Sequence, residues 1–158
     1  SALSVISTVR ADGSRPAIRS AGLDPSALTV EITESALAHH PEVAIRTLQA
    51  LKAIGVRIAI DDYGTGAASL DSLKRMPIDV LKLHESFVTG LDGDPEAASI
   101  AGAVIELAHA LGLSVVAEGV ETDLQLGELR SLGCDSAQGF FLSMPVSGER
   151  ASAIVAGN

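Results

Sequence analysis

Polar side chains of kinds that bind metals or catalyse reactions stand at the ends of several short apolar runs in this chain. The runs are rich in Val, Ile and Leu, and they read LTVEITE (28–34), RIAIDDYGTG (57–66), VLKLHES (80–86), SVVAEGVE (114–121) and SAQGFFL (136–142). If the runs are parallel strands, their C-terminal ends converge on one face, where sites are built. That face would receive Glu31, Glu34, Asp61, Asp62, Lys82, Glu118, Glu121 and Gln138.

The carboxylates in this set indicate which chemistry the face would carry. Six of the eight residues are Asp or Glu, and like charges held close together raise each other's pKa. A divalent cation, or a pair of them, is the natural counter-charge, because carboxylate oxygens suit Mg²⁺ and Mn²⁺. The sequence therefore predicts a metal site at this face.

The elements that must position these residues are repeated βα units. Each run is followed by helical sequence, which is typical of a parallel sheet. We expect strands at about residues 3–9, 28–33, 57–61, 79–84, 114–118 and 137–142. Helices are expected from Pro41, from Asp94–Pro95, from Thr122 with a capping box to Gln125, over 68–75 and after Gly148.

The strand count falls short of a closed (β/α)8 barrel, which has eight strands and roughly 200 residues or more. We therefore predict an α/β fold with one domain over residues 1–158, an incomplete TIM-like (β/α) barrel of about six strands that lacks the first two.

Composition excludes several classes of partner. The formal net charge is −9 and the aromatic content is 3%, which argues against binding of polymeric nucleic acid and of anionic membrane surfaces. The sequence shows neither an apolar stretch near the roughly 20 residues of a membrane span nor a signal peptide. A cytoplasmic location is the resulting expectation.

The run Asp61-Asp62-Tyr63-Gly64-Thr65-Gly66 is the sharpest local signal. Adjacent aspartates after a strand could bridge two cations and complete the shell of one, and Gly64 and Gly66 would let the following loop move or approach a phosphate. A helix N-cap followed by a glycine turn would explain the same residues equally well.

Glu31, Glu34 and Lys82 each allow more than one structural interpretation. Glu31 should point inward and Glu34 should belong to the loop, unless both belong to an N-cap cluster of the next helix. Lys82 lies in an apolar strand and must be paired, with Asp62 the favoured partner. A purely structural ion pair would also account for Lys82.

Two residues near the end of the chain extend the set. Glu118 follows the most apolar strand, where a carboxylate is costly without a metal or a base role. Gln138 could hydrogen-bond a ligand or fasten a loop. By contrast, the only cysteine, Cys134, reads as a buried thiol, and His109 reads as a surface or packing residue of a helix.

Taken together, the runs resemble the EAL domain family, the phosphodiesterases of the bacterial second messenger cyclic di-GMP. The resemblance covers about residues 22–147. It rests on E-I-T-E-S (31–35), D-D-Y-G-T-G (61–66), L-K-L (81–83) with S-F-V (86–88), A-E-G-V-E (117–121) and Q-G-F-F (138–141).

The resemblance implies a (β/α)8-type barrel in which two Mg²⁺ or Mn²⁺ ions activate a water. That water opens one phosphodiester of cyclic di-GMP and gives linear pGpG. Carried over by residue, Glu31 and Asp61 would be metal ligands, and Asp62 and Glu118 would serve the second ion or act on the water. Lys82 would orient the water or the phosphate.

The resemblance also implies supporting roles around these ligands. Glu34 would hold the D-D-Y-G-T-G loop, Glu121 would support the site, and Gln138 would contact the ligand. Tyr63 stands where the family usually has Phe.

The chain departs from the family pattern at two metal ligands. The E-A-L triplet, whose Glu is a ligand, is absent, and so is the Asn ligand of the next strand, where the comparable run is Ser4-Val5-Ile6-Ser7. His84 also replaces the family's Asp after L-K-I. We therefore expect a chain that is weak or inactive alone.

Three functional hypotheses follow. The first is a cyclic di-GMP phosphodiesterase domain, and the second is a degenerate EAL domain that binds cyclic di-GMP or a protein as a regulatory module. The third is an unrelated metal-dependent barrel enzyme. Because an open barrel exposes two sheet edges, a homodimer or a partner chain is expected to cover the gap.

Overall fold

The computed structural model describes residues 3–5, 20, 22, 24–35, 41–64 and 70–155. The strands are β1 (Leu3–Val5), β2 (Leu28–Thr33), β3 (Arg57–Tyr63), β4 (Val80–Leu83), β5 (Ser114–Ala117) and β6 (Ser136–Ala137). The helices are η1 (Pro25–Ala27), α3 (Pro41–Lys52), α4 (Leu70–Arg75), η2 (Glu85–Phe87), α5 (Pro95–Ala110), α6 (Asp123–Ser131) and α7 (Gly148–Val155).

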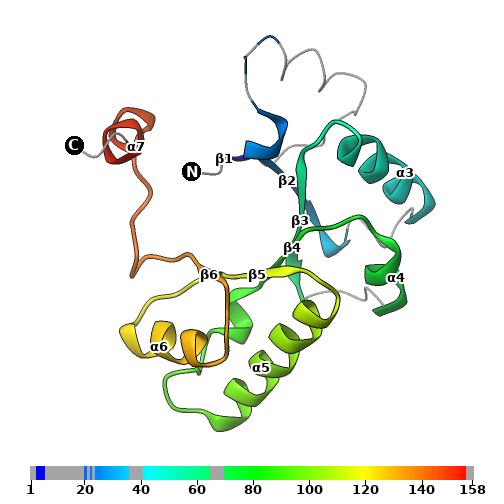
Figure 1. Cartoon of the computed structure of the whole chain (residues 1–158). Coiled ribbons are helices and arrows are strands. Elements are labelled where there is room, and N and C mark those ends of the chain that lie inside the picture. Colours follow the sequence, from blue (N-terminus) through cyan, green and yellow to red (C-terminus); the bar gives the residue numbers. More distant parts are fainter. Residues whose placement is uncertain are drawn as a thin grey trace.

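The six strands form one parallel sheet in chain order, β1-β2-β3-β4-β5-β6. Among the described residues β6 does not pair with β1, so the sheet is open. Figure 1 shows α3 to α6 around one side of the sheet, whereas α7 lies apart at the end of an extended segment. The predicted α/β fold, a TIM-like barrel short of closure, is confirmed.

The helix starts follow from local capping chemistry. The side chain of Asp94 accepts a hydrogen bond from the backbone of Glu96, and Pro95 occupies the first turn of α5. Thr122 and Gln125 form the predicted capping box at the start of α6. Within the described residues no helix is long and apolar enough to cross a membrane.

The hydrophobic core lies between the sheet and its helices and fixes which strand residues face away from it. Ile58 and Ile60 of β3 pack with Leu48 and Leu51 of α3 in one cluster. A second cluster joins residues of β4, β5, α5 and α6: Leu81, Leu83, Val115, Ala117, Ile105 and Leu129. Because side chains alternate along a strand, their neighbours on β3, β4 and β5 point to the opposite face.

The sixth strand is shorter than predicted. We expected strand over 137–142, but β6 ends at Ala137 because the chain turns at Gly139, whose carbonyl accepts from Leu142 and Ser143 at 3.0 and 3.1 Å. A Cβ on Gly139 would collide with the backbone of Val120, so only glycine fits this turn. The expected residues 6–9 of the first strand lie outside the described residues.

Candidate functional site

Strand alternation places four charged side chains on the face of the sheet away from the helices. Glu31 follows Val30, Asp61 follows Ile60 and Lys82 follows Leu81, and each preceding residue packs in a hydrophobic cluster. Glu118 continues β5 by one residue after the buried Ala117, and its backbone N–H donates to the Leu83 carbonyl at 3.1 Å. The four side chains therefore meet beside β4.

Lys82 is the centre of this group. Its Nζ lies 2.6 Å from Asp61 Oδ1, 2.7 Å from Glu118 Oε1 and 3.0 Å from Glu31 Oε2. The exposed fraction of the lysine side chain is 9%, and those of Glu31, Asp61 and Glu118 are 7, 15 and 17%. These short contacts in a largely buried setting are charge-assisted hydrogen bonds.

The partner of Lys82 differs from the one that the sequence favours. Asp62 was the expected partner, but the ion pairs are with Asp61, Glu31 and Glu118. The reason is local: Asp61 keeps the inward alternation of β3, whereas the register between β3 and β4 shifts between Ile60 and Tyr63.

Burial and ion pairing have opposing effects on the pKa of Lys82 and on that of Glu118. Burial alone would lower the pKa of Lys82, but hydrogen bonds to Asp61, Glu118 and Glu31 outweigh it and hold that pKa above its ordinary value. The pKa of Glu118 is raised, chiefly by burial and further by the charges of Asp61 and Asp62, although the ion pair with Lys82 opposes the rise. Lys82 therefore stays charged, and Glu118 binds a proton more readily than a free glutamate does.

The register shift between Ile60 and Tyr63 brings the adjacent carboxylates of Asp61 and Asp62 to one side. Asp62 has φ 57°, and it is the one non-glycine residue with positive φ in the described part of the chain. Asp tolerates this region better than most residues, and bulges re-aim side chains beside active sites. One carboxylate oxygen from each of Asp61, Asp62 and Glu118 lies within 4.8 Å of the other two.

The carboxylate group is the cluster of Glu31, Asp61, Asp62 and Glu118 around Lys82, and its charges do not balance. Glu31, Asp61, Asp62 and Glu118 are four carboxylates against the single ammonium of Lys82, an excess of three negative charges when all are ionised. All the donors are carboxylate oxygens, which suit hard cations such as Mg²⁺, Ca²⁺ and Mn²⁺. The residues present therefore fit a divalent cation.

Glu34 connects this group to the loop after β3. It is 2% exposed, and its Oε2 accepts a hydrogen bond from the backbone N–H of Gly64 at 2.9 Å. Gly64 has φ 102°, and a Cβ there would collide with the ring of Phe87. Burial, and then the charge of Glu34, raise the pKa of Tyr63. The loop is thus fastened at Gly64 by a buried carboxylate.

Gln138 reaches the same group from β6. Its Nε2 donates a hydrogen bond of 2.6 Å to Glu118 Oε1, the oxygen that also pairs with Lys82. The Gln138 backbone N–H donates to the Ala117 carbonyl at 2.8 Å, which aligns the residue with the end of β5. The amide therefore forms the last link in a chain from Asp61 through Lys82 and Glu118.

Other predicted residues lie outside this group. Glu121 is exposed, and its backbone N–H donates to Gln125 in the capping box of α6. Gly66 lies outside the described residues. His84, where the resemblance leads one to expect Asp, caps η2 by accepting from the backbone N–H of Ser86.

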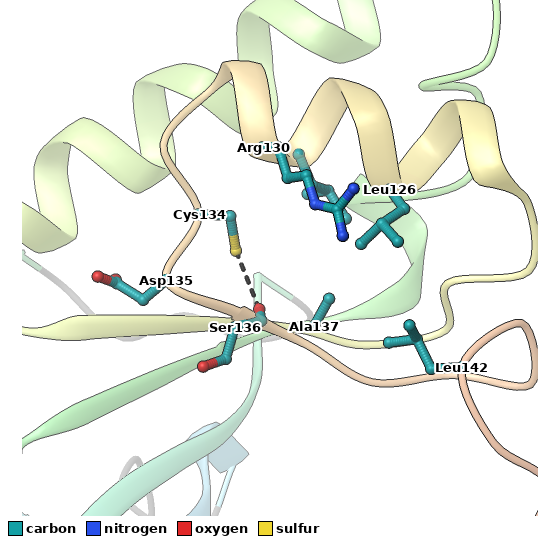
Figure 2. A pocket seen from close by; sticks show the side chains of 8 residues that line it. Leu126, Arg130, Cys134, Asp135, Ser136, Ala137 and Leu142 are labelled. Carbon is teal, nitrogen blue, oxygen red and sulfur yellow. Dashed lines mark hydrogen bonds between the residues drawn. The ribbon is translucent and has the colours of Figure 1, made fainter.

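A pocket of about 260 Å³ lies elsewhere, between α6 and the start of β6 (Figure 2). Its lining consists of Leu126, Leu129, Arg130, Cys134, Asp135, Ser136, Ala137 and Leu142. None of these residues belongs to the carboxylate group. Cys134, predicted as a buried thiol, is half-buried. Burial raises the pKa of its thiol, which makes it a poor nucleophile.

The family described as "EAL domain" matches residues 12–145 of this chain. Among curated proteins, the bifunctional diguanylate cyclase/cyclic di-GMP phosphodiesterase MucR of Pseudomonas aeruginosa is 43% identical over 145 residues. The match covers 92% of this chain and 21% of MucR. The chain thus spans about a fifth of the length of the first curated relatives that it matches.

Solved structures give the same result. The EAL domain of Mycobacterium smegmatis DcpA matches with a TM-score of 0.92 and 38% identity, over 99% of this chain and 73% of that one. Klebsiella pneumoniae BlrP1, in a complex with manganese and cyclic di-GMP, matches with a TM-score of 0.83 and 29% identity. That match covers 91% of this chain and 39% of BlrP1.

Proposed function

The chain belongs to the EAL domain family, and from that premise we propose that its open face binds cyclic di-GMP and divalent cations as part of a cyclic di-GMP phosphodiesterase domain. The observation that carries this proposal is the carboxylate group around Lys82. Its excess of negative charge sits at the C-terminal ends of parallel strands, where ligands of such sheets bind. An anionic ligand needs a cation between itself and this surface.

The roles of the residues follow from their positions. Glu31, Asp61, Asp62 and Glu118 would hold Mg²⁺ or Mn²⁺. When bound, such a cation would polarise a phosphodiester oxygen and lower the pKa of a bound water. Lys82 keeps the carboxylates of Asp61, Glu118 and Glu31 together.

The remaining residues hold the ligand and the loop. Glu34 fixes the loop after β3 through Gly64, and Gln138 presents its amide at the rim of the group beside Glu118. We propose that Gln138 contacts the ligand and that Glu121 supports the α6 side of the site.

This chain on its own should be a weak catalyst. It lacks the Glu of the E-A-L triplet and the Asn that the family resemblance implies as ligands. Catalytic geometry must hold to within about 0.5 Å, and loss of a group that merely supports a ligand already costs about 10–100-fold. We therefore propose weak metal binding and little or no hydrolysis of cyclic di-GMP to pGpG by the 158 residues.

A second candidate is a regulatory module that binds cyclic di-GMP or a protein without hydrolysis. The missing ligands favour it, whereas the charged group around Lys82 is shared by both proposals. Slow but detectable formation of pGpG at saturating Mn²⁺ would exclude the module, because only the enzyme hydrolyses cyclic di-GMP.

The open sheet suggests how the domain is completed. β1 and β6 are the edges of the described sheet, and several large apolar side chains after β6 are exposed: Phe140, Phe141, Leu142, Met144 and Val146. Open edges and apolar patches favour association. We propose a homodimer or a partner chain that covers them, and a cytoplasmic location in keeping with the family.

Calorimetric titration tests the proposal. Cyclic di-GMP should bind the purified chain in the presence of Mn²⁺ and more weakly with chelator, and the same samples should contain little pGpG. Asp61→Asn should remove the dependence on Mn²⁺. Binding that is unaffected by chelator and by Asp61→Asn would contradict the proposed site.

A further inference from the structure

Strand β6 has only two residues, yet side chains fasten it to β5 at both ends. Before the strand, Asp135 Oδ2 accepts a hydrogen bond from the backbone N–H of Val115 at 2.8 Å. After it, Gln138 Nε2 donates to Glu118 Oε1 at 2.6 Å. The first bond lies at the end of the sheet opposite the carboxylate group, and the second lies within that group.

Asp135 is itself held by the preceding helix. His109 Nε2, in the last turn of α5, lies 2.9 Å from the same oxygen, Asp135 Oδ2. The Val115 N–H, and then His109, hold the pKa of Asp135 below its ordinary value. Figure 2 shows the Asp135 carboxylate directed away from Arg130 and the pocket. The carboxylate thus joins α5, β5 and the start of β6.

The same arrangement occurs two βα units earlier in the chain, between β3 and β4. Asp79 Oδ2 accepts from the backbone N–H of Ile58 at 2.8 Å, and Lys52 Nζ lies 2.7 and 2.9 Å from the two Asp79 oxygens. Asp79 and Asp135 each stand one residue before a strand, and Ile58 and Val115 are each the second residue of the preceding strand. The basic side chain, Lys52 or His109, lies in each case in the last turn of the helix that precedes β3 or β5.

We propose that Asp135, supported by His109, is a positioning residue that sets β6 along β5 so that Gln138 reaches Glu118. The inference rests on the proposed function only in that Glu118 and Gln138 belong to the ligand site. The physical reason is the shortness of β6. Val116 opposite Ser136 and Ala117 opposite Ala137 are its only two register pairs in the described sheet.

Other contacts set the size of the expected effect. The Gln138 N–H bond to Ala117 and the Val120 N–H bond to the Gln138 carbonyl, at 2.8 and 3.1 Å, would survive the loss of Asp135. The side chains of Asp135 and His109 are 43 and 40% exposed, so their ion pair adds little to stability. Removing Asp135 should therefore displace β6 by loosening one end, and should not detach it.

Nuclear magnetic resonance of the side-chain amides provides a direct readout. The chain has three glutamines and one asparagine, so the spectrum is sparse, and Gln138→Glu assigns the Gln138 signal. In Asp135→Ala we expect this signal to move toward the position of an exposed glutamine, with faster exchange of the Val115 and Gln138 backbone amides. Asp79→Ala, which removes the equivalent bond from β3 and β4, should leave the Gln138 signal in place.

Two further variants keep the test decisive if Asp135→Ala does not fold. Asp135→Asn retains an oxygen that can accept from Val115 and should preserve the Gln138 signal. His109→Ala changes a half-exposed side chain and should give a smaller displacement in the same direction. A Gln138 signal that stays at the wild-type position in Asp135→Ala and in His109→Ala would overturn the proposal.

Ligand affinity separates this inference from the proposed function. If the chain binds cyclic di-GMP, Asp135→Ala should weaken binding by about tenfold, the lower range for loss of a supporting residue, and Asp135→Asn should restore it. If the wild-type chain binds no cyclic di-GMP, the proposed function fails, and the Gln138 signal alone still decides whether Asp135 positions β6.

Discussion

The two ends of the parallel sheet carry the same kinds of side chain in different proportions. At the C-terminal ends of the strands, Lys82 faces three carboxylates within ion-pair distance, and Asp62 lies beside two of them. At the N-terminal ends, Asp79 meets one lysine and one backbone N–H, and Asp135 meets one histidine and one backbone N–H.

The difference shows how a functional charge can be told from an architectural one. At the N-terminal ends Asp79 and Asp135 each have a basic side chain and a backbone N–H as partners, so these two carboxylates need no further ion. At the C-terminal ends four carboxylates share the ammonium of Lys82, and like charges held close together disfavour one another's ionised form. The excess charge is the reason for proposing ion binding at that end of the sheet.

Replacing Lys82 should have the largest effect on stability. Lys82→Met leaves three mostly buried carboxylates without their shared partner, and breaking a buried ion pair costs about 3–5 kcal/mol. Urea unfolding at neutral pH measures the loss. Addition of Mn²⁺ should recover part of it by supplying counter-charge, and a variant as stable as the wild type without metal would contradict the account.

Replacing Asp79 should have a smaller effect that metal does not change. Asp79→Ala leaves the Ile58 N–H without its acceptor, and an unsatisfied buried donor costs about 1–3 kcal/mol. Asp79→Asn can still accept that bond and should cost less. Recovery of Asp79→Ala by Mn²⁺, to the same degree as Lys82→Met, would erase the distinction between the two ends.

Acidification should release the weakest of these contacts. Because the pKa of Asp135 is lower in the folded chain than its ordinary 3.8, its contribution is complete above that value and is lost as the pH falls through the lower folded value. The stability difference between wild type and Asp135→Asn should thus be constant at neutral pH and shrink below about pH 4. A difference that grows on acidification would contradict this sign.

Much of the fold and part of the site could be predicted from the sequence because they depend on local patterns. Alternation along apolar runs placed Glu31, Asp61 and Lys82 on one face, and the capping box at Thr122 set the start of α6. The partners of Lys82 could not be predicted, since they depend on the bulge after Ile60. The bulge has no sequence signal beyond the paired aspartates.

The carboxylates at the opposite end were missed for a different reason. Asp79 and Asp135 bind backbone N–H groups that lie 21 and 20 residues away in the chain. Because almost every residue has a backbone N–H, such a partner cannot be recognised from the sequence. The available signal was position: each Asp directly precedes a strand. The length of β6 was wrong for a related reason, because the turn at Gly139 depends on the approach of the Val120 backbone.

Binding of Mn²⁺ tests the central claim most directly, and electron paramagnetic resonance of free Mn²⁺ measures it without any nucleotide. We predict that the wild-type chain binds Mn²⁺ weakly and that Asp79→Asn binds it equally well. Asp61→Asn should weaken binding by at least the roughly 10–100-fold that loss of a supporting residue costs. Equal affinities for Asp61→Asn and the wild-type chain would show that the excess carboxylates around Lys82 are not a cation site.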